Sequence, residues 1–296
     1  ERLLKFDSEL VTGLLNSWSD SKKVFRLIKR ISFERDDLPF RIDLSIVKTS
    51  RKIGPRLVPE YNLETSNVLN NPETYEVELE LIRSKTPTHI KDLEKQLKGG
   101  IKIILSALQK TNYPVSYREH NLVLQEYMRL IHKDVPDRKI YTSDFIGPSS
   151  ISLEIIHILQ PKDEISFPNI NTPYTVTEKA DGSRNLMFIS SIGKVYLINT
   201  NMEVIFTGCI CRNKECFNSL LDGEHVERDK NNKYINYFLV FDIYYQNGRS
   251  VMEFPFVEME GLAYTRKDMS KEIFRYKVLI QFLQSANFES VTSNPL

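Results

Sequence analysis

The sequence predicts an α+β fold of antiparallel sheets with flanking helices, divided into two domains at residues 1–134 and 135–296. Segments with apolar residues at every second position alternate along the chain with segments of helical periodicity. Residues 134–150 combine Pro, Gly and Ser, which is typical of a domain boundary. The 296 residues, of which 41% are hydrophobic and 27% charged, are sufficient for two globular cores.

The first domain is predicted to contain a helix, three strands and two further helices. The patterns place these elements, in order, at residues 1–17, 24–33, 38–50, 71–83, 89–110 and 116–133. Gly99 and Gly100 weaken the middle of the helix at 89–110, since a helical glycine costs about 1 kcal/mol relative to alanine.

The second domain is predicted to be rich in strands. A short helix is expected at residues 151–159, and a strand formed by the alternating TVT at 175–177 is expected to end before Lys179. Asp181-Gly182 is then a turn into a second strand. Further strands are expected at 220–227 and 236–245, and an amphipathic helix at 271–284.

The overall charge is balanced, with 40 basic and 39 acidic residues for a net charge of +1. This excludes a simple cationic coat for nucleic acid but allows a local basic groove. No apolar run approaches the roughly 18 residues that a transmembrane helix needs. The chain lacks an initiator methionine and a signal-like segment, so we expect it to be part of a longer polypeptide.

The three cysteines, Cys209, Cys211 and Cys216, lie within eight residues. An odd, sparse count argues against a disulfide framework and indicates a reducing compartment. A zinc site formed with His225 is an alternative, but the C-x-C-x4-C spacing is not that of a familiar zinc finger. We therefore predict free thiols at a strand end and the following loop.

Residues 75–81, YEVELEL, place three glutamates on one face of a strand. Glu76, Glu78 and Glu80 alternate with apolar residues, so the carboxylates follow one another at about 7 Å. One interpretation is the solvated face of an antiparallel sheet. The other is an oxygen-ligand site for Mg²⁺ or Mn²⁺ inside a barrel lumen.

The neighbouring strands carry cations that could face these glutamates. Arg26 and Arg30 belong to one strand, and Arg41 and Asp43 to the next. Rows of carboxylates and guanidinium groups would suit a polyphosphate held through a metal ion and arginine forks. A salt-bridged sheet face has the same composition, and both interpretations remain open.

The six residues from Lys179 to Arg184, KADGSR, combine groups that suit nucleophilic chemistry on a phosphate. A lysine amine attacks phosphorus only when it is deprotonated, which nearby cations or desolvation favour. Arg184 would supply positive potential and a hydrogen-bonding fork, and Gly182 would allow a positive φ and close approach of a ligand. The alternative is an ordinary solvated turn.

Three residues downstream complete this pattern. Glu224, in LLDGEHV, is expected at the start of a strand, where it could accept hydrogen bonds from ribose hydroxyls. Phe241 could stack on a base, and Asp242 could act near a metal ion or phosphate. Taken singly they would be a turn acid, a core aromatic and a strand-end cap. Their order after the lysine motif favours the functional interpretation.

The segments TEKADGSR, LLDGEHV and FLVFDIYY together resemble the motifs of the covalent nucleotidyltransferases, which include mRNA guanylyltransferases and polynucleotide ligases. With the glutamate strand ahead of them, the order of parts resembles the bifunctional triphosphatase–guanylyltransferase of large DNA viruses such as poxviruses, asfarviruses and mimivirus-like viruses. The resemblance is specific over residues 174–245 and moderate over residues 24–83. It implies a tunnel-type β-barrel domain followed by a nucleotidyltransferase domain.

The resemblance also implies roles for individual residues. Lys179 would form a lysyl-N–GMP, Arg184 and Glu224 would contact the ribose, Phe241 would stack on guanine, and Asp242 would position phosphate or metal. Glu78 and Glu80 would bind metal, and the tunnel would be lined by Glu76, Arg26, Arg30, Arg41 and Asp43.

The sequence departs from the family pattern at several points. Ile28 stands where the R-x-K-x-R strand of the tunnel has lysine. An earlier strand with two metal-binding glutamates, the later nucleotidyltransferase motifs and an oligonucleotide-binding barrel are all missing. Both domains are therefore expected to be partial.

The resemblance implies mRNA capping: removal of the RNA γ-phosphate, followed by transfer of GMP from GTP. The implied partners are triphosphate-ended RNA, GTP, and an RNA polymerase or a cap methyltransferase domain or subunit, with no membrane. The implied location is the host cytoplasm or the virion. Two alternatives stay open, an ATP-dependent polynucleotide ligase and a non-catalytic subunit that binds RNA ends.

Overall fold

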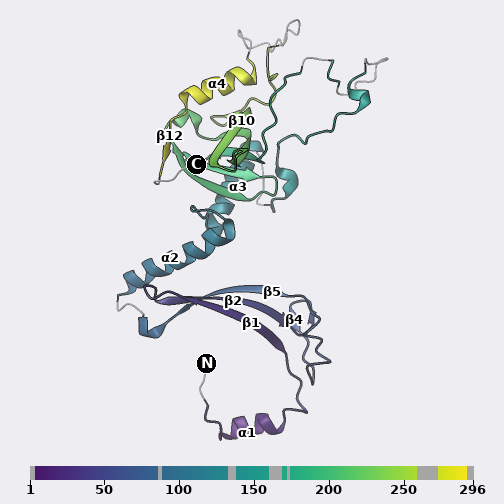
Figure 1. Cartoon of the computed structure of the whole chain (residues 1–296), viewed down its shortest axis with the longest axis vertical. Coiled ribbons are helices and arrows are strands. Elements are labelled where there is room, and N and C mark those ends of the chain that lie inside the picture. The colour runs from purple at the N-terminus through teal and green to yellow at the C-terminus, as the bar shows by residue number, and fades with distance from the viewer. Residues whose placement is uncertain are drawn as a thin grey trace. The chain divides into compact units, whose positions relative to one another are not determined.

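A computed structural model of the chain describes residues 4–85, 89–132, 138–159, 169–171, 174–258 and 273–291 (Figure 1). The chain divides into two compact units, Glu1–Ile104 and Leu105–Leu296, and the division falls within helix α2 (Ile90–Gln109). The domain boundary expected after residue 134 stays a prediction. Within the described ranges, none of the helices is long and apolar enough to cross a membrane.

The first unit is built on a three-stranded antiparallel sheet in the order β1-β2-β5 (Figure 1). The strands are β1 (Arg26–Glu34), β2 (Phe40–Thr49) and β5 (Thr74–Leu81). The smaller elements are α1 (Glu9–Asn16), the hairpin of β3 (Lys52–Ile53) and β4 (Arg56–Leu57), and the 3-10 turn η1 (Arg83–Lys85). The sheet curls through part of a barrel, and a complete tunnel-type barrel stays a prediction.

The register of this sheet sorts charged and apolar side chains onto opposite faces. Asp43 of β2 lies between Ser32 of β1 and Glu78 of β5, whereas Leu44 lies between Ile31 and Val77. The alternation predicted for β5 is therefore confirmed. Apolar side chains of the second face keep 40–57% of their surface exposed; they are Leu27, Ile31, Phe33, Leu44, Val77 and Leu81.

Helix α2 runs unbroken through Gly99 and Gly100, where the sequence predicted a weak point. The reason is packing within the first unit. Phe40 is only 2% exposed, and a Cβ atom at Gly100 would lie 2.5 Å from the tip of its ring. Glycine at this position therefore allows β2 and α2 to approach closely, which offsets its low helix propensity.

The second unit contains a seven-stranded antiparallel sheet in the order β11-β10-β9-β6-β7-β8-β12. Its strands are β6 (Ser183–Ile189), β7 (Lys194–Asn199), β8 (Val204–Cys211), β9 (Ser219–Arg228), β10 (Tyr234–Gln246), β11 (Arg249–Ser250) and β12 (Phe288–Ser290). Its helices are α3 (Tyr117–Ile131), α4 (Arg275–Ser285) and the 3-10 turns η2 (Thr142–Asp144), η3 (Ile155–His157) and η4 (Lys214–Cys216).

Two hydrophobic cores hold the helices against the opposite faces of this sheet. Leu186 and Phe188 of β6 pack with Tyr127 of α3, whereas Ile189 of the same strand packs with Phe282 of α4. Strand side chains alternate between faces, so one strand supplies both cores. The flanking helix predicted at 271–284 is thus confirmed as α4. The helix predicted at 116–133, within the first domain, is α3 and packs against the sheet of the second unit; α3 is teal and α4 yellow in Figure 1.

Three local expectations are wrong in detail. The strand expected at 175–177 does not form: Val176 is 97% exposed, and the alternating residues have no face to bury. The first helix begins at Glu9, and residues 4–8 are not helical. The helix expected at 151–159 is reduced to the single turn η3.

Candidate functional site

A cluster of arginine, aspartate and tyrosine lies on the α3 side of the seven-stranded sheet. Asp222 of β9 is fully buried, and its carboxylate accepts hydrogen bonds from Nε of Arg184 at 3.1 Å, from Nη2 of Arg184, and from the Tyr244 hydroxyl. A buried charge is costly unless it is paired and hydrogen-bonded. These contacts satisfy Asp222 and fix the guanidinium of Arg184 in one orientation.

The electrostatics of the cluster keep its members in single protonation states. The hydrogen bond to Asp222 raises the pKa of the Arg184 guanidinium. Burial, followed by the hydrogen bond to Asp222, raises the pKa of the Tyr244 phenol. Arg184 is therefore a fixed positive charge, and Tyr244 a fixed donor, at neutral pH.

Arg184 is also enclosed by two aromatic rings. Its guanidinium carbon lies 5.7 Å from the ring centre of Phe145 and 6.0 Å from that of Phe241, within the range of cation–π attraction. Its Nη1 donates to the carbonyl oxygen of Pro148. Phe241 remains 39% exposed, so one of these rings still presents surface to a ligand.

Glu224 is the direct cross-strand partner of Arg184 in the β6–β9 ladder. It is half-buried and lies in the middle of β9, not at the start of a strand as the sequence suggested. Neighbouring residues at such positions project from the same face of a sheet. The structure thus brings together three of the predicted site residues, Arg184, Glu224 and Phe241, from three adjacent strands.

Lys179 lies in the exposed segment 174–182 that leads into β6, and its Nζ is 3.4 Å from the carbonyl oxygen of Ala180. Gly182 follows three residues later, and its φ is not positive, contrary to expectation. A Cβ atom at Gly182 would instead collide with the backbone oxygen of His225 and lie 3.1 Å from Cγ of Glu224. Glycine therefore lets the segment after Lys179 run directly against β9 beside Glu224.

Asp242 is engaged with a different element. Its two carboxylate oxygens accept hydrogen bonds from Nε and Nη2 of Arg275, at 2.8 and 2.9 Å, at the first residue of α4. This bidentate ion pair attaches β10 to α4. A role for Asp242 near phosphate or metal stays a prediction.

The sequence interpretation missed the residues that hold Arg184. Asp222 stands two positions before Glu224, so strand alternation alone could have placed both on the face of Arg184. Tyr244 lies in the apolar half of β10, where the sequence alone indicates a core aromatic. Phe145 and Pro148 lie on the segment before β6, and no local sequence pattern connects them with Arg184.

In the first unit, all seven predicted tunnel and metal residues lie on the charged face of the sheet and form ion pairs. Arg30 bridges Asp43 at 3.3 Å and Glu78 at 2.7 Å, and Arg41 bridges Asp43 at 3.3 Å and Glu80 at 2.5 Å. The remaining pair is Arg26 with Glu76. The Ser32 hydroxyl and the two guanidinium groups at Arg41 and Arg30 lower the pKa of the buried Asp43.

The described residues contain no group of three or more His, Cys, Asp or Glu side chains that could hold a metal ion. Glu78 and Glu80 instead accept hydrogen bonds from arginines. Their assignment as metal ligands stays a prediction.

The three cysteines form no disulfide, as predicted. Cys209 and Cys211 lie at the end of β8, and Cys216 lies in η4. Burial raises the pKa of the Cys216 thiol to about 11, which disfavours the thiolate that zinc binds. Nε2 of His225 lies 2.7 Å from the Asn236 amide oxygen. These observations support structural cysteines over the alternative zinc site.

Comparison with known proteins identifies one family. The family model described as "mRNA capping enzyme, catalytic domain" matches residues 105–287, which is more than half of the chain. The matched range contains Lys179, Arg184, Glu224, Phe241 and the buried Asp222. No curated protein matches the chain.

Proposed function

Because the chain belongs to the mRNA capping enzyme family, we propose that it transfers GMP from GTP to the 5′ end of RNA through a covalent intermediate on Lys179. One observation carries this proposal. Arg184, Glu224 and Phe241 gather on adjacent strands, and the segment that bears Lys179 enters the sheet beside Glu224. The lysine proposed as nucleophile thus lies on a segment that runs beside groups suited to a nucleoside phosphate.

The chemistry balances as two displacements at one phosphorus atom. The neutral amine of Lys179 forms a bond to the α-phosphorus of GTP, the bond to the β-phosphate oxygen breaks, pyrophosphate leaves, and the nitrogen releases one proton to solvent. A terminal oxygen of a 5′-diphosphate RNA then attacks the same phosphorus and displaces the lysine nitrogen, which takes up a proton from solvent as it leaves. The products are capped RNA and the regenerated amine.

The neighbouring residues take roles that match their environments. Glu224 is half-buried and accepts hydrogen bonds from the ribose hydroxyls, and the exposed ring of Phe241 stacks on guanine. Arg184, held by Asp222, contacts the ribose and places a positive charge near the phosphates. Such preorganised charges stabilise negative charge that develops at the phosphate.

The family also implies Mg²⁺ or Mn²⁺, which would neutralise the phosphates of GTP. The carboxylates predicted to bind a metal ion do not offer a ready ligand set, since Asp242, Glu78 and Glu80 each pair with arginine. The residues therefore do not fit a resident metal ion in this arrangement. Mg²⁺ is best treated as part of the MgGTP substrate.

Exchange of labelled pyrophosphate into GTP tests the proposed function. The first displacement is reversible, so the full chain should incorporate the label into GTP when MgGTP and pyrophosphate are both present. With ATP the incorporation should remain at background. Exchange with ATP alone would identify the ligase alternative, and exchange with neither nucleotide would favour the non-catalytic RNA-end-binding alternative.

Glu224→Ala is expected to impair transfer far more than it impairs folding. Losing the hydrogen bonds to the ribose should lower GTP–pyrophosphate exchange about tenfold to hundredfold, while stability changes by only about 0.5 kcal/mol. Exchange kinetics and thermal melting measure the two effects. Normal exchange in a variant with collapsed thermal stability would instead make Glu224 a structural residue.

A second activity, removal of the RNA γ-phosphate, is proposed for the first unit. The observation that favours it is the arrangement of three arginines and four carboxylates on one sheet face, with the glutamates and arginines partly exposed. A triphosphate could exchange the Arg–Glu pairs for Arg–phosphate pairs, which are bidentate and strong.

Replacing both Glu78 and Glu80 with alanine is expected to abolish γ-phosphate release while GTP still labels the second unit. Once a triphosphate takes their places on Arg30 and Arg41, the two carboxylates would be free to bind the metal ion that accompanies the substrate, and alanine removes both ligands. The fold should survive, because Arg30 and Arg41 each keep Asp43 as a partner. A phosphate-release assay on triphosphate-ended RNA, at fixed Mg²⁺ or Mn²⁺, measures the effect.

The matched control for this double variant is Glu73→Ala. Glu73 pairs with Lys48, whose side chain projects to the other face of the same sheet. Unchanged phosphate release in the double variant would assign the charged face a structural role. The family pattern has lysine at position 28, where this chain has isoleucine. Because this departure removes one expected cation, the phosphate-release assay decides whether the first unit is active.

The order of the two parts further supports a proposal about origin and surroundings. A triphosphatase ahead of a guanylyltransferase is the arrangement of large DNA viruses, and we extend the proposal to such a source. The enzyme would then act in host cytoplasm or virions, beside an RNA polymerase or a cap methyltransferase domain or subunit.

A further inference from the structure

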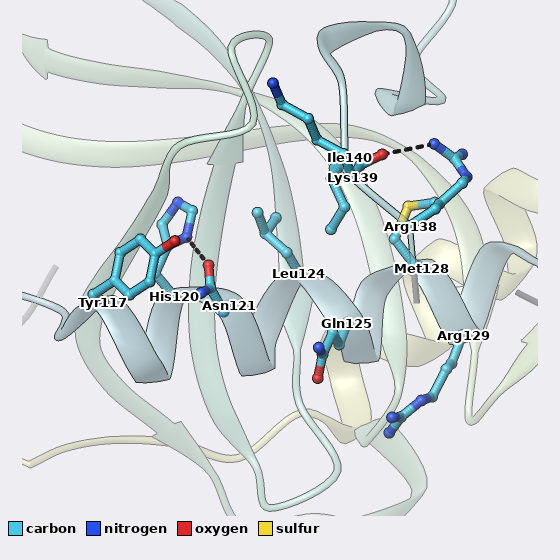
Figure 2. A pocket seen from close by; sticks show the side chains of 10 residues that line it. All are labelled: Tyr117, His120, Asn121, Leu124, Gln125, Met128, Arg129, Arg138, Lys139 and Ile140. Carbon is cyan, nitrogen blue, oxygen red and sulfur yellow. Dashed lines mark hydrogen bonds between the residues drawn. The ribbon is translucent and has the colours of Figure 1, made fainter. Parts of the chain in front are cut away.

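A cavity of about 530 Å³ lies beside α3 in the second unit (Figure 2). Its volume falls in the range of about 300–1,000 Å³ that small-molecule sites occupy. It contains none of the residues assigned above to the nucleotide. Among the described residues, those that line it come from α3 and from the segment 138–140.

One face of α3 forms most of the cavity. The lining positions recur at intervals of three and four residues, which places them along one stripe of the helix. They are Tyr117, His120, Asn121, Leu124, Gln125, Met128 and Arg129. Leu124 and Met128 are buried and belong to the hydrophobic core, while Tyr117 is 82% exposed. The stripe therefore combines an apolar floor with an exposed aromatic ring, amides and a cation, as Figure 2 shows.

The charged side chains that line the cavity are cations, namely Arg129, Arg138 and Lys139. Among the described residues, no carboxylate lines it. The two glutamates of α3 are engaged elsewhere: Glu119 with Lys194 and Tyr196, and Glu126 with Ser191. Arg138 is fixed by a bidentate pair with Asp144. Within the parts of the chain that the structure describes, no carboxylate pairs with Arg129 or Lys139, which keeps both available for an anion.

A continuous segment connects this cavity with the proposed GMP site. Arg138, Lys139 and Ile140 line the cavity, and Phe145 and Pro148 contact Arg184 a few residues later. Fully extended, the eight steps from Ile140 to Pro148 span at most about 28 Å. A polymer whose 5′ end occupies the GMP site can therefore reach the cavity with its following nucleotides.

We propose that this cavity binds the single-stranded RNA chain behind its 5′ end. Arg129 and Lys139 contact phosphates, Tyr117 stacks on a base, and the amides of Asn121 and Gln125 bond base edges. Sites for single-stranded RNA commonly combine cations, which contact the phosphates, with aromatic side chains, on which the bases stack. The inference rests on the proposed function, since only an enzyme that modifies an RNA end needs to hold the strand behind it.

The test is fluorescence anisotropy of a labelled ten-nucleotide RNA with a 5′-diphosphate, titrated with the full chain in the absence of GTP. Arg129→Glu/Lys139→Glu should weaken binding about tenfold and reduce the salt slope by about 1.4, because each single-strand phosphate contact contributes about 0.7. Tyr117→Ala should weaken binding about fivefold or more with an unchanged salt slope.

The matched control is Lys214→Glu/Lys277→Glu, which makes the same charge change at exposed residues of η4 and α4. It should leave RNA affinity within about twofold of the original, and thermal melting confirms that each variant is folded. Equal loss in the control, or unchanged binding in the cavity variants, would overturn the proposal. If the cavity variants bind RNA normally but are no longer labelled by GTP, the cavity would be a mononucleotide site and the proposal would be overturned. Labelling of the unmodified chain by GTP, measured without RNA, tests the proposed function separately.

Discussion

Lys179→Ala is expected to abolish the covalent guanylate adduct, and Lys179→Arg is expected to abolish it equally. Alanine has no nucleophile, and a guanidinium stays protonated and cannot attack phosphorus. Lys179 is exposed in the structure, so both variants should keep their stability within about 0.5 kcal/mol of the original chain. Labelling by α-labelled GTP and thermal melting measure the two properties on the same preparations.

Lys214→Ala provides the control for general loss of a surface lysine, since Lys214 is exposed in η4, outside the proposed site. It should label as well as the original chain. An adduct that persists in either Lys179 variant, attached to another lysine, would disprove the assignment of the nucleophile while leaving the family membership intact.

Asp222→Asn is expected to produce the second large effect, on stability and on transfer together. The change leaves the guanidinium of Arg184 without its counter-charge in a buried site, where losing one partner of an ion pair costs about 3–5 kcal/mol. The Arg184 side chain is 25% exposed, so the lower end, about 3 kcal/mol, is expected. Denaturant unfolding measures the loss, and guanylylation should fall because Arg184 is no longer held.

Two further variants distinguish the effect of the buried Arg184–Asp222 ion pair from that of an exposed ion pair and from that of the Tyr244 hydrogen bond. Glu289→Gln makes the same chemical change in the exposed pair with Arg212 and should cost between about 0 and 1 kcal/mol. Tyr244→Phe removes only the hydroxyl that donates to Asp222 and should cost about 1 kcal/mol. If Asp222→Asn were no more costly than Glu289→Gln, the cluster would not be the element that orients Arg184.

The strand pattern and the order of motifs predicted much of this arrangement. Strand alternation in residues 75–81 correctly separated the glutamates from the apolar face, and the sequence placed Arg184 and Glu224 together before their ladder was known. The first inference relies on a period-2 pattern, which is a local property of the chain, and the second relies on the order of the motifs that resemble the family.

The remaining features depend on contacts between distant residues. Asp222 is not among the predicted site residues, and its role follows from the hydrogen bonds that Arg184 and Tyr244 donate to its carboxylate. Gly100 was expected to weaken its helix, whereas Phe40 of a distant strand requires its small size. Conversely, residues 175–177 have the composition of a strand, but no strand among the described residues pairs with them. The secondary-structure propensity of a short segment does not predict its contacts with residues far away in the sequence.

The most direct test of the central proposal is to incubate the full chain with MgGTP and locate the product by mass spectrometry. The proposal predicts one added GMP, joined to Lys179 through a bond that is labile in acid and stable in alkali. ATP should give no adduct, and pyrophosphate should remove the GMP. An adduct at a different residue, an adduct formed with ATP, or no adduct at all would contradict the proposed guanylyl transfer through Lys179.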